Sequence, residues 1–409
     1  VLAVATAALA VAGVAMITRA NDDAPGAASP PSVVESADPK AAEDADPGLW
    51  SSVYHDRGAY ERNDGSVMSS VTAAGPGFVA VGGSDDTAAV WTSADGEVWS
   101  RVPHDDTVFG GDDETRMSSV TAGGPGLVAV GSSDGNAAVW TSADGLTWAR
   151  VPHDDAVFGG QVDDLSMASV TAGGPGLVAV GTSGTFAAAD AAVWTSADGL
   201  TWARVPHDDT VFGGEDRQVM YDVAVGGPGL VAVGKDGRGG WDNSPSQNAA
   251  VWTSVDGLTW ARVPHDDAAF GNGKPAMVSV AAGGPGLVAV GWSSPHPAPA
   301  AVWTSTDGLT WAPVAHENGS EMSGTMVHVT AGGPGLLAVG SGGTEAAVWS
   351  SADGLTWSLE AQSETKPGAL PSSWMWGLSA TEARVVTVGY FTRDLDSGPA
   401  AAAWLSPNP

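Results

Sequence analysis

A ten-residue sequence that recurs six times constrains the fold of this chain more than any other feature. The copy at 139–148 reads VWTSADGLTW, and the others occupy 90–99, 193–202, 251–260, 302–311 and 348–357. In each copy two Trp residues flank an Asp-Gly pair, which is a strong signal for a tight turn between antiparallel strands. The sequence therefore predicts six β-hairpins within one repeat domain, because a fixed period overrides the number of domains suggested by length.

The segments between the hairpins predict two further strands in each repeat. A strand of small and β-branched residues (117–122) is followed by a Gly-Gly-Pro-Gly turn and an apolar strand (127–132). Successive hairpins begin 46 to 58 residues apart, close to the ~50-residue unit of a kelch-type propeller. The apolar strands do not alternate with polar residues, so both faces of each sheet must be covered, as in stacked blades. We expect four strands of about five or six residues per repeat.

Counting the repeats predicts how the ring closes. A seventh, degenerate unit begins at Trp374 and ends with its third strand at 401–406, where Trp404 takes the place of the first hairpin Trp. The segment 49–53 matches the outermost strand that this unit lacks. We therefore predict an all-β fold, a seven-bladed β-propeller of four-stranded antiparallel blades over 48–409. The N-terminal strand joins the last blade, so that no strand edge is left open.

The N-terminal region predicts export. Residues 1–19 are an apolar run closed by Thr18-Arg19, which is interpreted as a signal peptide or a membrane anchor. Residues 20–47 are rich in Ala, Pro and Asp and predict a disordered linker. Both interpretations of 1–19 place the propeller outside the cell, secreted or N-terminally anchored at the cell surface, with the membrane contacted only through this segment.

Charge and composition limit the partners. The formal net charge is −31, from 16 Lys and Arg against 47 Asp and Glu, and this field opposes binding to nucleic acid. The absence of Cys rules out disulfides and thiol catalysis. Acidic runs at 112–114 and 163–164 could hold calcium, but they lack the spacing of a recognised calcium loop. We expect a monomer with no cofactor, and calcium is the one ion that the sequence leaves open.

The hairpin resembles the Asp-box of sialidases, sortilin-type receptors and related bacterial propellers with BNR-like repeats. That pattern is Ser-x-Asp-x-Gly-x-Thr-Trp, and here Asp and Gly are adjacent instead. The Ser hydroxyl and the Asp carboxylate can accept N–H groups of the turn while Gly takes a positive φ. In those families the box is a structural turn away from the active site, so the resemblance supports the fold and not an activity. The Asp-box residues are Ser93, Asp95, Trp99, Ser142, Asp144, Trp148, Ser196, Asp198, Trp202, Ser254, Asp256, Trp260, Ser305, Asp307, Trp311, Ser351, Asp353 and Trp357.

A sialidase-like glycoside hydrolase is the alternative function that the resemblance raises. It would need an arginine triad, a Tyr/Glu nucleophile pair and an acidic proton donor. Tyr221, beside Asp222 on an innermost strand, is the one attractive nucleophile. No arginine set serves it, so we assign no catalytic residue. The repeated arginines are predicted on outermost strands that cannot converge on one carboxylate: Arg101, Arg150, Arg204 and Arg262.

A second repeated motif, Pro-His-Asp-Asp, follows the hairpins in the loops between blades. A His beside carboxylates suggests a metal or acid–base site. Equivalent positions on the outer edges of neighbouring blades diverge, however. We therefore interpret the motif as a His-Asp pair that fixes the crossover loop, with a Phe filling the gap between blades. The residues concerned are His55, His104, His153, His207, His265 and His316, with Phe109, Phe158, Phe212 and Phe270.

Departures from the repeat point to a binding face. The loops between the second and third strands lengthen in three consecutive blades, at 182–189, 235–248 and 293–300. An aromatic side chain with adjacent charge on a loop suits recognition of a sugar or a peptide. The sequence therefore predicts a non-catalytic binding or interaction module for a glycan or protein ligand, with a structural cell-surface spacer as a further alternative. The candidate ligand-binding residues are Trp241, Arg238, Asp242, Trp292, His296 and Tyr221.

Overall fold

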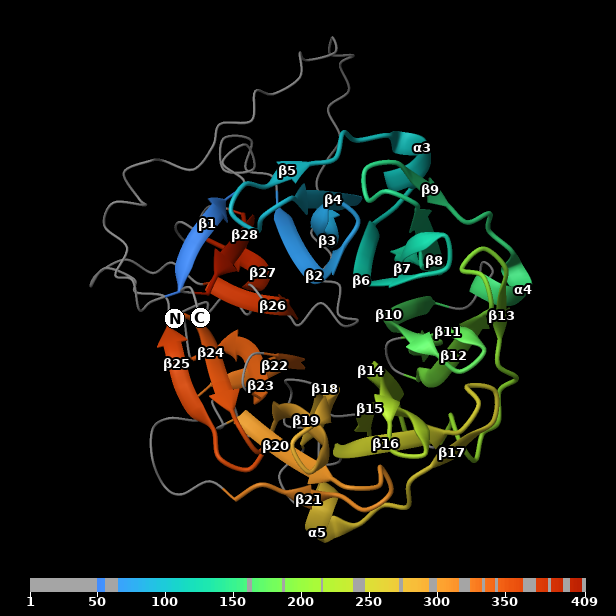
Figure 1. Ribbon diagram of the computed structural model, residues 1–409. Coiled ribbons are helices and arrows are strands. Elements are labelled where there is room, and N and C mark those ends of the chain that lie inside the picture. Colours follow the sequence, from blue (N-terminus) through green and yellow to red (C-terminus); the bar gives the residue numbers. More distant parts are fainter. Residues whose placement is uncertain are drawn as a thin grey trace, which may run out of the picture.

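A computed structural model shows seven four-stranded antiparallel sheets arranged in a ring (Figure 1). The predicted seven-bladed β-propeller is confirmed. No helix among the described residues is long and apolar enough to cross a membrane. The predicted signal or anchor segment and the linker lie outside the described residues, which are 50–55, 65–159, 164–185, 188–214, 216–237, 247–271, 275–293, 300–315, 324–332, 335–342, 345–362, 373–381, 384–392 and 398–406.

The two inner strands of each blade are long. The innermost strands, which surround the axis of the ring (Figure 1), are β2 (Ser66–Ala74), β6 (Thr115–Gly123), β10 (Leu165–Gly173), β14 (Gln218–Gly226), β18 (Ala276–Gly283), β22 (Thr325–Gly332) and β26 (Ser373–Ala380). The second strands are β3 (Gly77–Ser84), β7 (Gly126–Ser133), β11 (Gly176–Ser183), β15 (Gly229–Asp236), β19 (Gly286–Trp292), β23 (Gly335–Ser341) and β27 (Val385–Phe391).

The outermost strands are shorter than expected, two or three residues in five blades. A Val-Pro pair follows most of them, and because proline has no N–H it ends the ladder there. The third strands are β4 (Thr87–Ser93), β8 (Asn136–Ser142), β12 (Asp190–Ser196), β16 (Asn248–Ser254), β20 (Ala300–Ser305), β24 (Ala346–Ser351) and β28 (Ala400–Leu405). The outermost strands are β5 (Ser100–Arg101), β9 (Trp148–Arg150), β13 (Trp202–Arg204), β17 (Trp260–Arg262), β21 (Ala312–Pro313), β25 (Ser358–Gln362) and β1 (Ser51–His55).

The ring closes between the two ends of the chain, as the repeat count predicts. β1 is the outermost strand of the last sheet, in the order β1-β28-β27-β26, and Ser52 pairs with Trp404. On the other side of this junction, Arg384 of the degenerate turn in blade seven forms an ion pair with Glu97 of the first hairpin. Glu97 stands where all five other hairpins have Leu, so the ion pair is specific to the junction between the last and the first blade.

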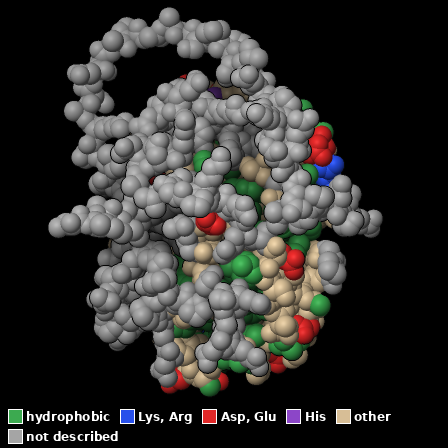
Figure 2. All heavy atoms as spheres, turned by 90° about the vertical axis from the view of Figure 1, so that its left-hand side faces the viewer, with side chains coloured by type: hydrophobic (Ala, Val, Ile, Leu, Met, Phe, Trp, Pro, Cys, Tyr) green, Lys and Arg blue, Asp and Glu red, His purple; other side chains and the backbone are tan. Residues whose placement is uncertain are grey.

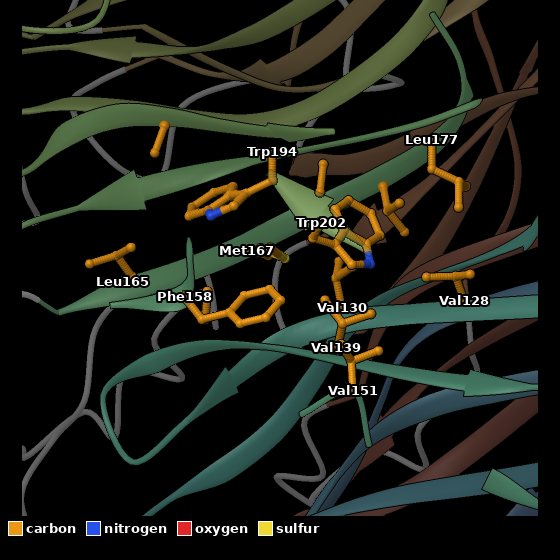
Figure 3. Packing of buried hydrophobic residues seen from close by; sticks show 14 residues of the cluster. Val128, Val130, Val139, Val151, Phe158, Leu165, Met167, Leu177, Trp194 and Trp202 are labelled. Carbon is orange, nitrogen blue, oxygen red and sulfur yellow. The ribbon is translucent and has the colours of Figure 1, made fainter. Parts of the chain in front are cut away.

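The core lies between neighbouring blades and repeats around the ring. In Figure 3, Val130 and Val139 of the second blade face Met167 and Trp194 of the third, with Phe158 of the crossover loop beside them. Met167 and Trp194 are completely buried. The Trp194 indole also donates Nε1–H to the Val157 carbonyl at 2.7 Å, which joins the third blade to the preceding crossover loop. Burial on both faces explains why these strands do not alternate.

Side chains close the hairpin turns. In the second blade, Gly145 N–H donates to Ser142 Oγ at 2.9 Å, and Leu146 and Thr147 N–H donate to Asp144 Oδ1 at 2.8 and 2.7 Å. The Trp148 indole donates to the Gly145 carbonyl, and Gly145 has a φ of +78°. The N–H donors hold the pKa of Asp144 below its usual value. The same arrangement lowers the pKa of the other Asp residues of the hairpins: Asp95, Asp198, Asp256, Asp307 and Asp353.

Three copies of the Pro-His-Asp-Asp motif lead into a one-turn helix, and their two carboxylates have different roles. Asp154 caps α4 (Asp155–Phe158) by accepting the Ala156 N–H, while His153 pairs with Asp155 at 2.9 Å. α3 (Asp106–Phe109) and α5 (Asp267–Phe270) are capped and paired in the same way. The buried Phe at the end of each helix packs into the gap between blades. The geometry favours the structural interpretation of this motif.

Candidate ligand site in the central channel

The described residues enclose a cavity of about 440 Å³ along the axis of the ring, lined mainly by the innermost strands. Because every blade contributes the same register positions, the wall of this central channel can be compared blade by blade. Positions that depart from the repeat are therefore the positions that blade packing alone does not require.

A belt of polar residues runs around the channel. Each innermost strand has a β-bulge just after its buried Met. Where a serine occupies this bulge, its hydroxyl bonds to the neighbouring blade. Val120 N–H donates to Ser70 Oγ at 3.3 Å, and Val329 N–H donates to Ser279 Oγ at 3.2 Å. Successive blades are thus joined by side-chain hydrogen bonds. The belt positions are Ser70, Ser119, Ser169, Asp222, Ser279, His328 and Gly377.

Asp222 replaces the belt serine in the fourth blade and binds three blades instead of two. Its Oδ1 accepts from Ser169 Oγ at 2.6 Å and from its neighbour Val223 N–H at 2.9 Å. Its Oδ2 accepts from Ser279 Oγ at 2.8 Å and from Val280 N–H at 3.0 Å. Four donors occupy the lone-pair sites of a carboxylate. The Asp222 carboxylate therefore has no free lone pair with which to abstract a proton.

Two other belt positions also depart from serine. Burial lowers the pKa of His328, although the Asp222 charge and a hydrogen bond with the Leu378 backbone oppose this shift. The imidazole is therefore neutral at neutral pH. At Gly377 an added Cβ would lie 3.0 Å from the Ser70 Cα, so the last and first blades approach too closely for a side chain.

The channel wall just before the belt has two different halves. Blades one to three place Ser69, Ser118 and Ala168 there, whereas blades four and seven place Tyr221 and Trp376. Blades five and six have valine at this position, so the second half is apolar throughout. One half of the wall thus carries small side chains, most of them with a hydroxyl group, and the other half carries aromatic and apolar side chains.

The aromatic half forms one contact group. Tyr221 lies against Trp292 of the next blade, with ring centroids 6.3 Å apart and planes tilted by 45°. Trp376 packs against the same cluster, although it comes from the seventh blade, and it stacks on Trp374 at 5.6 Å. The Trp376 Nε1 is buried and has no acceptor among the described residues. An indole N–H can only donate, and leaving it unpaired in the interior is costly.

The structure describes two of the six predicted ligand-binding residues. It brings the rings of Tyr221 and Trp292 together, but only Tyr221 lines the channel. Trp241, Arg238, Asp242 and His296 lie outside the described residues. The second predicted loop is shorter than expected, since Lys235 belongs to β15 and its side chain is buried.

Trp376 and the role of Asp222 were not predicted. Both departures from the repeat are visible when the seven innermost strands are aligned, where Asp222 stands among serines. In that alignment Trp376 occupies the position held by Ser69 and Ser118 in the first two blades.

The described residues do not bring together a glycosidase site. Each repeated arginine lies on an outermost strand and stacks on a hairpin Trp at 5.4–6.0 Å. Burial raises the pKa of Tyr221 to about 12, against an opposing effect of Arg217, so its hydroxyl is a poor nucleophile. Asp222 is the one carboxylate among the described residues that line the channel, whereas glycoside hydrolysis ordinarily uses a pair. Within the same residues, no group of three or more His, Asp or Glu side chains is placed to hold a metal ion.

Figure 2 shows acidic side chains spread among apolar ones on the described surface of one side of the ring. This distribution agrees with the strongly negative net charge.

Comparisons with known proteins give distant structural similarity alone. No family model and no curated protein sequence matches the chain. A crystal structure of a protein of unknown function from Dyadobacter fermentans is 13% identical with a TM-score of 0.44, and the match covers 84% of this chain and 95% of that one. Trypanosoma rangeli sialidase is 12% identical with a TM-score of 0.43, covering 84% of this chain and 55% of the sialidase. YCF48 bound to D1 peptide is 12% identical with a TM-score of 0.36, covering 89% and 96%. Similarity at this level carries no functional information.

Proposed function

We propose that the protein is an exported, non-catalytic binding module whose ligand enters the central channel and contacts its aromatic half. The observation that carries this proposal is the break in repeat symmetry. Packing of near-identical blades needs only small residues at the inner wall, as Ser69, Ser118 and Ala168 show. Tyr221 and Trp376 exceed that need, and aromatic side chains facing a cavity are typical of ligand sites.

The chemistry of the wall favours the end of a glycan as the ligand. A sugar ring has an apolar face that can stack on Tyr221 or Trp376, and hydroxyls that can bond to Ser69 and Ser118. The cavity of about 440 Å³ lies in the range of ~300–1,000 Å³ that is usual for small-molecule sites. A folded protein ligand would need a broad outer surface, about 800 Å² on each partner.

Export and family membership are part of the same proposal. The apolar segment 1–19 followed by the polar segment 20–47 supports secretion or surface anchoring, with the propeller outside the cell. The side-chain-closed hairpin turns support a place among Asp-box propellers.

A binding screen on residues 48–409, with calcium and with chelator, tests the ligand class. We expect capture of one or more glycans by the unaltered protein and loss of capture, at least tenfold, in Trp376→Ala. The matched control is Val255→Ala, because Val255 is 77% exposed on a hairpin turn outside the channel lining. Equal glycan capture by Trp376→Ala would contradict the channel site. Selective capture of peptides, or turnover of fluorogenic glycosides that disappears in Tyr221→Phe, would replace the proposal with a protein ligand or an enzyme.

A further inference from the structure

We infer that the channel selects its ligand by charge, accepting an uncharged saccharide and rejecting acidic ones, and that Asp222 determines this preference. The inference rests on the proposed function, since it concerns the same site. It goes further by excluding a chemical class of ligand and by naming the residue responsible.

The channel contains the carboxylate of Asp222, and no Lys or Arg is among the described residues that line the cavity. Four hydrogen bonds hold this carboxylate in place, while the buried Arg217, outside that lining, acts on the Tyr221 hydroxyl. His328 and Tyr221 are the other titratable groups of that lining, and burial favours the neutral form of each. A ligand carboxylate would therefore meet a like charge, and no Lys or Arg of the described lining would contact it.

Asp222 acts through its field and need not touch the ligand. Its lone-pair sites are already occupied, so it offers a sugar hydroxyl no vacant acceptor. A ligand carboxylate about 7 Å away, at an effective dielectric constant of about 20, would bind roughly 50-fold more weakly than a neutral group. The surface charge of the protein adds repulsion that salt screens within about 8–10 Å, whereas the charge within the channel is screened much less.

A neutral sugar can contact the channel wall without bringing a negative charge near Asp222. Its apolar face can lie on the ring of Tyr221 or of Trp376. The hydroxyls of Ser69 and Ser118 can donate or accept. None of these interactions requires a charge on the ligand.

Matched pairs of methyl glycosides test the inference on the full chain. The probes are the glucoside and glucuronide, the galactoside and galacturonide, and the mannoside and mannuronide, compared by saturation-transfer NMR and titration calorimetry in 150 mM salt. We expect the neutral member of a bound pair to bind at least tenfold more tightly than its acid. Asp222→Ser should reduce this ratio about tenfold while keeping the belt intact, because serine occupies the position in four other blades.

The control removes an equal charge elsewhere. Asp106→Asn alters an Asp whose side chain is 92% exposed on a crossover loop, and it should leave the ratio unchanged. Asp222→Asn is a second variant of similar shape, and a lowered ratio in both channel variants supports the inference. Acids that bind as tightly as the neutral sugars, or a ratio unaffected by either Asp222 variant, would overturn the inference and leave the binding site in place. Failure of every neutral and acidic sugar to bind would instead refute the glycan ligand itself.

Discussion

Replacement of Asp222 by alanine should destabilise the propeller more than replacement by serine. In Asp222→Ala, the Val280 N–H loses its acceptor, whereas the Val223 N–H can bond to Ser169 Oγ, and a buried N–H left unpaired costs about 1–3 kcal/mol. The expected loss in free energy of unfolding is therefore about 1–3 kcal/mol. In Asp222→Ser, the regular belt can form again, because Ser169 Oγ can accept from Val223 and the new hydroxyl can accept from Val280. That variant should lie within about 1 kcal/mol of the unaltered protein.

Denaturation followed by Trp fluorescence measures the difference, with the transition midpoint compared at equal slope. Ser119→Ala is the matched control, because it removes a belt serine that bonds to the Val170 N–H and not to Asp222, and it should cost about 1–2 kcal/mol. If Asp222→Ala and Asp222→Ser are equally stable to within 1 kcal/mol, the carboxylate does not join the three blades in the manner described. A larger loss of stability in Ser119→Ala than in Asp222→Ala would show that the serines, and not Asp222, contribute most to the stability of the belt.

Three other outcomes follow from the packing and the turns. Gly377→Ala should lower the free energy of unfolding by about 1–3 kcal/mol, because the added Cβ would lie 3.0 Å from the Ser70 Cα. Gly83→Ala is the control in the same melting experiment and should be tolerated, because the nearest contact of its added Cβ is at 3.6 Å. Phe158→Ala should cost about 3–5 kcal/mol in denaturant titration, and a cost under 1 kcal/mol would show that the crossover helix is not part of the core. The hairpin Asp residues have lowered pKa values, so their contribution to the stability of the folded state is complete above the unfolded pKa of about 4 and is lost as pH falls through the folded pKa. The melting temperature should therefore be steady from pH 7 to about 5 and should fall below about pH 4. The fall should be less steep in Asp144→Asn.

The fold could be predicted because the same sequence pattern recurs in every blade. The hairpin sequence predicts the outer half of each blade, and the number of copies predicts the number of blades in the ring. No strand follows the one that contains Trp404, which predicts that β1 completes the last blade. The length of the outermost strands could not be predicted in the same way. It depends on the Val-Pro pair that follows most of these strands and ends their pairing, and the hairpin pattern stops before that pair.

The candidate site was only partly predictable for a physical reason. Tyr221 was recognisable as an aromatic on an innermost strand, and Trp292 as an aromatic next to a lengthened loop. Their contact with Trp376 depends on the ring size, because Trp376 comes from a blade that adjoins neither of theirs. The four bonds of Asp222 depend on the bulge that turns the belt residue toward its neighbours. A comparison of aligned repeats identifies such positions, but only the closed ring shows what they contact.

The pairing of β1 with β28 has a consequence for how the protein is made. Ser52 and Trp404 are partners, so the first strand to be synthesised waits while 352 further residues are added. At about 5–20 residues per second that wait lasts roughly 20–70 s. During it, the edge of β1 is exposed, and so is the edge of blade seven in any chain that has been completed but not closed. Two such chains can exchange these strands with the same hydrogen bonds that close one ring, so crowded synthesis should yield interlocked pairs whose amount rises with concentration.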